Sequence, residues 1–252
     1  MKVFFRKLHR WLGLLMALQI VAWMGSGLYF SVFPIEEIRG EHLTLSAKKP
    51  AAGDLAGLLS PAEAWASFHE HQEGRARLAG MSLHAGLGQT WYKIRGSVGD
   101  SAVTRLVDAR TGEVMPFLSG EQAAEAAAQR LAEPAEIIGV ELVENASAGS
   151  EFRGRALPVW RVSFEGPENL NLYIDGWTGE IVARRTDKWR LFDFLWMLHI
   201  MDFDTRDDFN TPLLQVAAAL GLVVALSGVI FWLMTTRLLR ARKPSLPEST
   251  SL

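Results

Sequence analysis

The chain has 252 residues, a formal net charge of −2 and 49% hydrophobic residues, which is enough for one or two small domains beside any membrane spans. It contains no cysteine, which excludes disulfides, thiolate nucleophiles, iron–sulfur clusters and covalently attached c-type haem. The charge is uneven, because the region between residues 34 and 211 carries −9. Such an acidic region is a poor partner for nucleic acid and favours cationic partners.

Two uncharged stretches, residues 11–33 and 212–235, are long enough to cross a hydrocarbon core of about 30 Å as helices. Basic residues flank them on the terminal sides: Lys2, Arg6, Lys7, Arg10, Arg237, Arg240, Arg242 and Lys243. The positive-inside rule therefore predicts cytoplasmic ends, residues 1–10 and 236–252, and a main domain outside the bacterial inner membrane, in the periplasm. The first stretch is too long for a signal-peptide core and has no A-x-A-like site after it, so we expect an uncleaved anchor.

Small residues at four-residue spacing occur in both stretches, for example Gly13 with Ala17 and Ala217 with Gly221. This spacing lets helices approach closely, so it predicts that the spans pack together or form a homodimer in the bilayer. Counting depth from the two ends places Gln19 level with Ser227, where a hydrogen bond between the spans is expected.

Residues 34–58 form a juxtamembrane turn and a linker. An internal repeat follows, and its first copy, residues 59–117, opens with the capping box Ser60-Pro61-Ala62-Glu63 before a predicted helix. Strand-like runs come at residues 79–83, 90–94 and 103–108. We therefore expect one helix laid on a small antiparallel sheet.

The second copy, residues 118–187, opens with Ser119-Gly120-Glu121-Gln122 and continues with strand-like runs at residues 138–144, 158–164 and 169–175. Both copies close with D-x-x-T-G-E, which begins at Asp108 and at Asp175. Aspartate at the start and glycine four residues later are typical of a hairpin turn with a left-handed glycine. The shared acids are therefore interpreted as turn formers and not as catalytic carboxylates.

Residues 188–203 are nearly all apolar and precede the second span, so they predict a helix lying in the outer interface. Asn210 or Thr211 is then expected to cap the second span, with Pro212 in its first turn. The fold class that follows is membrane α+β, with two transmembrane helices flanking two tandem helix-on-sheet modules.

Three segments resemble the PepSY-associated transmembrane proteins. They are residues 8–14 (LHRWLGL), the turn from Phe33 to His42, and residues 198–202 (LHIMD), while the D-x-x-T-G-E closures resemble PepSY modules. The resemblance implies an inner-membrane protein with PepSY domains in the periplasm that contact a protein or peptide partner, with iron or siderophore uptake as a setting. Larger relatives with four spans are haem-bearing reductases, whereas this chain has two.

Histidine is the usual axial ligand of b-type haem, so His42, His199 and His9 are the candidate cofactor ligands. His42 and His199 both fall at the outer interface, where one could face the other, so they are the favoured pair within a single chain. His9 lies at the cytoplasmic mouth of the first span, where bis-histidine ligation would need a second chain. Met197 and Met201 are further candidates. The alternative is that these histidines are structural interfacial residues.

Other polar clusters predict no metal and no catalytic residue. His69 and His71 are two residues apart, so on a helix they point to different faces. The acids between residues 202 and 208 lack the glycine and the terminal glutamate of a calcium-binding loop. No enzyme signature occurs. We therefore expect a membrane-anchored binding or accessory module, and the alternative is a haem-binding electron-transfer subunit of a membrane oxidoreductase.

Overall fold

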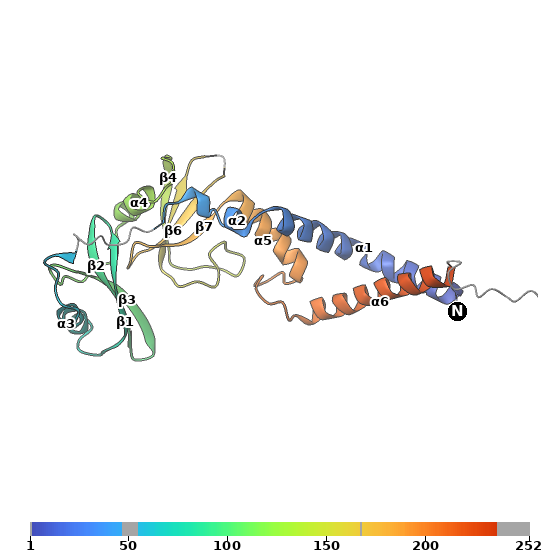
Figure 1. The fold of residues 1–252 in the computed structure, drawn as a ribbon, viewed down its shortest axis with the longest axis horizontal. Helices are drawn as coiled ribbons and strands as arrows, with labels where there is room; N and C mark the ends of the chain where they lie inside the picture. Colours follow the sequence, from blue (N-terminus) through green and yellow to red (C-terminus); the bar gives the residue numbers. More distant parts are fainter. Residues whose placement is uncertain (1, 47–54, 167, 236–252) are drawn as a thin grey trace, which may run out of the picture. The chain divides into compact units, whose positions relative to one another are not determined.

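The computed structural model describes residues 2–46, 55–166 and 168–235 (Figure 1). The chain divides into two compact units. The membrane unit contains helix α1 (Lys2–Val32), the end of helix α5 (Asp187–Ile200) and helix α6 (Pro212–Thr235). Phe33–Phe192 form the other unit, called the outer unit here after the location that the sequence predicts for it. The linker expected before residue 55 lies partly outside the described residues, and so does the C-terminal tail.

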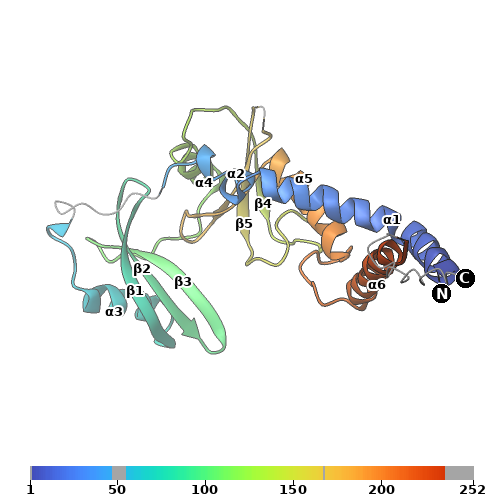
Figure 2. The same cartoon turned by 45° about the vertical axis from the view of Figure 1, so that its right-hand side comes forward.

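Helices α1 and α6 lie side by side and antiparallel, in both views (Figure 2). Both are long and apolar enough to cross a membrane, with spans at Arg6–Val32 and Pro212–Thr235. Met16, Ala217 and Val224 form the core between them, and Gly13 faces Val224 closely. Thr211 caps α6, since its Oγ1 accepts a hydrogen bond from the amide of Leu214. The prediction that the two spans pack together is therefore confirmed for a single chain.

The predicted hydrogen bond between Gln19 and Ser227 is wrong. Gln19 donates instead to the carbonyl of Leu198 at 3.0 Å, and Ser227 lies 3.1 Å from Nδ1 of His9. Counting depth from the ends of the uncharged stretches gave the wrong register. His9, which precedes the first uncharged residue, already lies level with Ser227, and Gly13 lies opposite Val224. Gln19 then faces α5 and not α6.

The first part of the outer unit contains helix α2 (Ile35–Ile38), the short 3-10 helix η1 (Glu41–Leu43) and helix α3 (Pro61–His71). Strands β1 (Ala76–Gly86), β2 (Gln89–Val98) and β3 (Ser101–Asp108) follow and form an antiparallel sheet in that order. The capping box of α3 is present, because Ser60 and Glu63 bond each other's backbone amides. Phe68 of α3 is fully buried against Ile94 and Val107, so the helix covers one face of the sheet.

The second part contains helix α4 (Gly120–Ala128) and strands β4 (Ile137–Val143), β5 (Val159–Phe164), β6 (Asn171–Asp175) and β7 (Ile181–Arg185). They form an antiparallel sheet in chain order. The expected helix on a small sheet is confirmed here too, including the capping box of Ser119 and Gln122. Strand β7 was not predicted as a strand. It adds to the sheet because Gly179 turns the chain back along β6.

The two closing motifs adopt the same turn. Asp108 Oδ1 accepts from the amides of Arg110 and Thr111, and Asp175 Oδ1 accepts from those of Trp177 and Thr178. Gly112 and Gly179 both have left-handed backbones, at φ 81° and 67°. The interpretation as turn formers is therefore confirmed for the two shared aspartates, whereas the carboxylate of Glu180, the shared glutamate of the second motif, pairs with Lys93.

Helix α5 ends at Ile200, three residues before the predicted end of the interfacial helix. Met201 leaves the helix with φ 53°, and Asp202 then organises the loop to α6. Its carboxylate accepts hydrogen bonds from the amides of Asp204, Thr205, Asp207 and Asp208. Asp193 and Arg206 form an ion pair that ties α5 to this loop. The hydrogen bond from the Thr205 hydroxyl, with those of the amides, lowers the pKa of Asp202.

Candidate functional site

The two sheets of the outer unit share one hydrophobic core. Trp91 and Leu106 of the first sheet belong to the same buried cluster as Val162, Leu172 and Ile174 of the second. Alternate residues of a strand point to opposite faces, so β2 and β3 bury one face under α3 and offer the other to the second sheet. The two modules are therefore joined, and the surface above this joint collects side chains from both.

The turn between β1 and β2 lies at the joint. Gly86 pairs with Gln89, so Leu87 and Gly88 form a two-residue hairpin loop. Both have left-handed backbones, with φ 53° at Leu87 and 80° at Gly88. A leucine in this region is uncommon and strained. The indole of Trp91 donates to the carbonyl of Gly86 at 2.9 Å and so anchors the turn.

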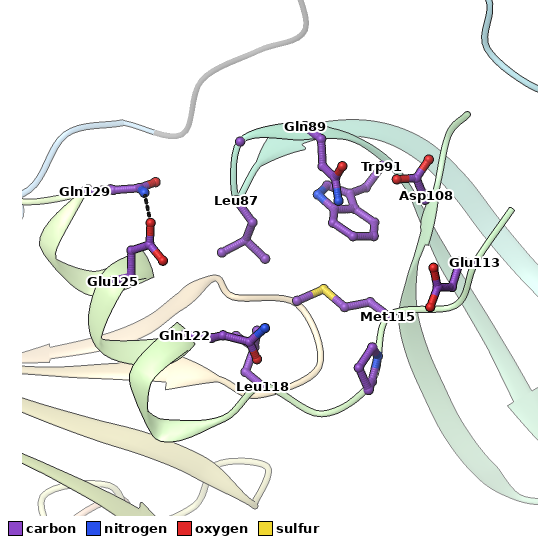
Figure 3. Close-up of a pocket in the computed structure, with 12 residues that line it drawn as sticks. Leu87, Gln89, Trp91, Asp108, Glu113, Met115, Leu118, Gln122, Glu125 and Gln129 are labelled. Atoms are coloured by element: carbon purple, nitrogen blue, oxygen red, sulfur yellow. Dashed lines mark hydrogen bonds between the residues drawn. The ribbon is translucent and has the colours of Figure 1, made fainter. Parts of the chain in front are cut away.

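A cavity of about 320 Å³ opens beside this turn (Figure 3). Its floor is apolar and includes Leu87, Trp91, Met115 and Leu118. Leu87 comes from the β1–β2 turn and Met115 from the segment before α4, and their side chains point toward each other (Figure 3). The volume lies at the lower end of the range of ligand pockets, which suits a few side chains rather than a large cofactor.

The rim of this first cavity is acidic. Asp108, Glu113 and Glu125 line it together with the amide side chains of Gln89 and Gln129. Glu125 accepts a hydrogen bond from Gln129 at 3.0 Å, and Asp108 is held by its own turn. None of these three acids forms an ion pair with any residue in the described ranges.

A second cavity of about 460 Å³ lies on the other side of the turn and shares Leu87, Gly88, Gln89 and Gln129 with the first. Its own lining contains His84, Arg130 and Thr178. Arg130 donates to the carbonyl of Leu45 through two nitrogens, at 3.0 and 2.6 Å. The two cavities therefore flank one strained turn and carry different charged groups.

Polar contacts hold the two modules together beneath the second cavity. Glu180 of the second closing turn accepts from Lys93 of β2 at 2.5 Å and lies 3.7 Å from Nδ1 of His84. Burial lowers the pKa of His84; Glu180 acts in the opposite direction, and Lys93 and Arg130 lower it further. Arg105 of β3 stacks on the ring of Trp177, 3.5 Å from its centroid.

The sequence did not reveal this joint. The acids of the D-x-x-T-G-E motifs, including Asp108 and Glu113, were interpreted only as turn formers, and Leu87 and Arg130 were not singled out. The one local signal is the run Gly86-Leu87-Gly88 between two strands, which is typical of a tight hairpin loop. Which side chains meet around that loop depends on tertiary packing and has no local signature.

The predicted ligand His199 lies in the membrane unit, where its Nδ1 is 2.6 Å from the hydroxyl of Ser26. That hydroxyl donates to the carbonyl of Ala22 at 2.6 Å, so its single hydrogen is used, and Nδ1 of His199 must donate to it. Phe30 and Trp196 flank the ring, with centroids at 5.5 and 6.4 Å.

His9 is anchored in the same way. Its Nδ1 lies 3.1 Å from both the carbonyl of Val224 and the hydroxyl of Ser227. A carbonyl oxygen only accepts, so Nδ1 carries the hydrogen. Gly228 leaves room for this ring, because a Cβ atom there would approach His9 Cε1 to 2.9 Å.

His42 belongs to the outer unit, so it lies in a different unit from His199. Its Nε2 lies 3.5 Å from Glu168 Oε1, and Lys188 bridges Glu168 and Glu37 nearby. The hydrogen bond between the side chains of Glu37 and Lys188 lowers the pKa of Glu37 and raises the pKa of Lys188. His9 and His199, by contrast, share the membrane unit, where His9 contacts α6 and His199 contacts α1.

The other polar clusters have structural partners. The ring of His69 packs at a tilt against Trp65, with centroids 5.3 Å apart, whereas the side chain of His71 is exposed to solvent. Within the described ranges, no group of three or more histidine or acidic residues is arranged to hold a metal ion.

Comparison with known proteins agrees with the presence of two helices that are apolar enough to cross a membrane. The family described as PepSY-associated TM region matches residues 6–248. No curated protein matches the chain significantly. One solved structure matches, a protein of Clostridium difficile 630 described as a lipoprotein, with 12% identity over 52% of this chain and 95% of that one. Its TM-score is 0.22, which is too low to define the fold.

Proposed function

Because the chain belongs to the PepSY-associated TM family and is a membrane protein, we propose that it presents its outer unit in the periplasm as a binding module for a protein or peptide partner. The two helices anchor the module in the bacterial inner membrane. The family resemblance favours a partner in iron or siderophore uptake. No catalytic residue is assigned.

One observation carries the proposal. The first cavity combines an apolar floor with a rim of acids that have no ion-pair partner in the part of the chain that the structure describes. Buried apolar area supplies affinity in a peptide complex, while a few polar groups at the edge fix the orientation. The rim amides of Gln89 and Gln129 can both donate to and accept from a peptide backbone.

Hydrogen exchange tests the proposal. The full chain in lipid nanodiscs is exposed to an equimolar mixture of random-sequence heptapeptides, and amide exchange is followed by mass spectrometry. We expect slower exchange at residues 85–91, 113–118 and 122–129. An unchanged pattern in these segments at saturating peptide would contradict the proposal, as would protection confined to other surfaces.

Reporter fusions test the location. A periplasm-active reporter at residue 120 and a cytoplasm-active reporter at the C-terminus should both give signal. The reason is the clustering of basic residues at both ends of the chain. A cytoplasmic signal at residue 120 would overturn the periplasmic assignment.

The second candidate is a haem-binding electron-transfer subunit, with His9 and His199 as ligands. The observation that favours it is the anchoring of both rings through Nδ1, which leaves Nε2 as the unprotonated nitrogen of each neutral imidazole. Metal-ligating histidines usually donate the other ring nitrogen in this manner. His42 fits less well, since its Nε2 faces Glu168. Haem would supply one-electron transfer.

The two histidines would serve separate sites. Ser26, which anchors His199, lies about 25 Å along α1 from His9 at about 1.5 Å per residue. Each site has one histidine from this chain, so bis-histidine ligation would require a homodimer. A visible spectrum of the purified protein from haem-rich cells tests this candidate. Soret absorbance that is reduced in His9→Ala and in His199→Ala, lost when both are replaced, and kept in His69→Ala would support it, and no Soret absorbance in the unaltered protein would exclude it.

A further inference from the structure

The two cavities beside the Leu87 turn carry opposite net charge. The acids of the first, Asp108, Glu113 and Glu125, have no ion-pair partner among the residues of the described ranges. Around the second cavity, one acid, Glu180, faces Lys93, Arg130 and the titratable His84. The net negative charge of the first cavity and the net positive charge of the second lie on either side of the Leu87 turn, and together they create a dipolar surface.

Resting on the proposed function, we propose that this surface binds an extended peptide segment that places a lysine or arginine in the first cavity and a carboxylate in the second. The carboxylate is an acidic side chain or the C-terminus of the peptide. The Leu87 turn then lies beneath the backbone between these two groups.

The first cavity suits a long basic side chain more than a small cation. Its floor of Leu87, Trp91 and Met115 can cover the methylene stem, while the charged head reaches the acids at one edge, either Glu125 or Glu113 with Asp108 (Figure 3). Lysine and arginine bind in this manner, with an apolar stem and a solvated head.

The second cavity suits a carboxylate. Two nitrogens of Arg130 bond the carbonyl of Leu45, which fixes the guanidinium in place. Burial lowers the pKa of Arg130. Burial also lowers the pKa of Arg184, and the nearby positive charge of Arg130 lowers it further. An incoming carboxylate would stabilise these partly buried cations, since an opposite charge favours the ionised form.

The backbone strain at Leu87 supports a role at this position. Asparagine or glycine would adopt φ 53° at lower energy in a two-residue loop. Leucine directs an apolar side chain at Gly179 of the neighbouring module and at the cavity floor. Strain of this kind is retained where the surrounding structure or a ligand requires the side chain.

Three synthetic pentapeptides test the inference on the full chain in nanodiscs by fluorescence anisotropy. The first is N-terminally labelled Gly-Lys-Leu-Gly-Gly with a free carboxylate, the second is its C-terminal amide, and the third has glutamate in place of lysine. We expect the first to bind tightest. Loss of either charge pair should weaken binding at least about threefold.

Charge variants locate the two halves. The double variant Glu113→Lys with Glu125→Lys should weaken the lysine peptide and strengthen the glutamate peptide, whereas Arg130→Gln should abolish the preference for the free carboxylate. Asp100→Lys, at the exposed β2–β3 turn, changes the net charge by the same amount as one of the two glutamate-to-lysine changes. It should leave the affinity for each peptide unchanged.

The outcomes separate this inference from the proposed function. If the random heptapeptides protect the cavity but the three pentapeptides bind equally, or none binds, the dipolar inference is wrong and the binding function stands. If neither the heptapeptides nor the pentapeptides bind, both are wrong. Reversal of peptide preference in the double variant, with Asp100→Lys unchanged, supports the inference.

Discussion

The side chain of Leu87 packs against Gly179, so that a Cβ atom at Gly179 would approach Leu87 Cδ1 to 3.2 Å. Leu87 belongs to the turn of the first sheet and Gly179 to the closing turn of the second. Both residues have left-handed backbones. This contact joins the two modules at the point where the two cavities meet.

Replacement of the closing glycines should destabilise the outer unit. Gly112→Val and Gly179→Val each force a β-branched side chain into a left-handed backbone, which we expect to cost about 1–3 kcal/mol. A Cβ atom at Gly112 would also approach Ser67 Oγ to 2.9 Å. Thermal unfolding measures the effect. Gly99→Val is the comparison, because its backbone is also left-handed but no atom lies within 4 Å of an added Cβ, so it should lose only the part of the stability that backbone strain accounts for. Unchanged unfolding in both Gly112→Val and Gly179→Val would contradict the turn assignment.

Gly176 should tolerate no side chain while Phe117 is present. An added Cβ atom would overlap the Phe117 ring, which also contacts Trp177 edge-on with centroids 4.8 Å apart. Gly176→Ala should therefore lower the unfolding midpoint by the equivalent of about 1–3 kcal/mol. In the double variant with Phe117→Ala, the two losses should be less than additive. Additive losses would show that the ring does not cover Gly176.

The ion pair of Asp193 and Arg206 should stabilise the loop before α6. Only 5% of Asp193 is exposed, so Asp193→Asn leaves a partly buried guanidinium without its charge partner and should cost about 3 kcal/mol. The exposed pair of Arg161 and Glu141 provides the control. Arg161→Gln should cost at most about 1 kcal/mol. Equal losses from the two variants would contradict the assigned burial of Asp193.

The joint between the modules should weaken in mild acid. The pKa of His84 lies below its ordinary value of about 6.5, mainly because the ring is partly buried, so the folded state binds its proton less readily than the unfolded state. Its contribution to stability is therefore complete above about pH 6.5 and is lost as the pH falls below that value. His84→Gln should flatten the decline in thermal stability below about pH 6.5, and the exposed His71→Gln should not. If the decline in thermal stability is unchanged in His84→Gln, another titratable group causes it and the prediction is wrong.

Local features of the sequence predicted much of the fold. Charge-free stretches located α1 and α6, and Ser60 and Ser119 marked the starts of α3 and α4. The D-x-x-T-G-E motif predicted the left-handed Gly112 and Gly179. Each of these depends on interactions between residues close in the sequence, which is why pattern and propensity suffice.

The remaining features depend on contacts between distant segments. The sequence shows Gln19 as a polar residue in an apolar helix, but its partner, the carbonyl of Leu198, is set by where α5 ends. The candidate site was missed for the same reason. Leu87, Glu113 and Arg130 come from separate elements, and only the shared core around Trp91 and Leu172 brings them together.

The Met115 methyl group gives the most direct measurement of the central claim, peptide binding in the first cavity. The full chain in nanodiscs is labelled with ¹³C at methionine methyls, and Met115→Leu assigns the signal. On titration with the random heptapeptide mixture, we predict a shift of the Met115 signal and none at Met81, which packs in the separate core under α3. An unchanged Met115 signal at saturating peptide, or a shift of Met81 alone, would contradict the account.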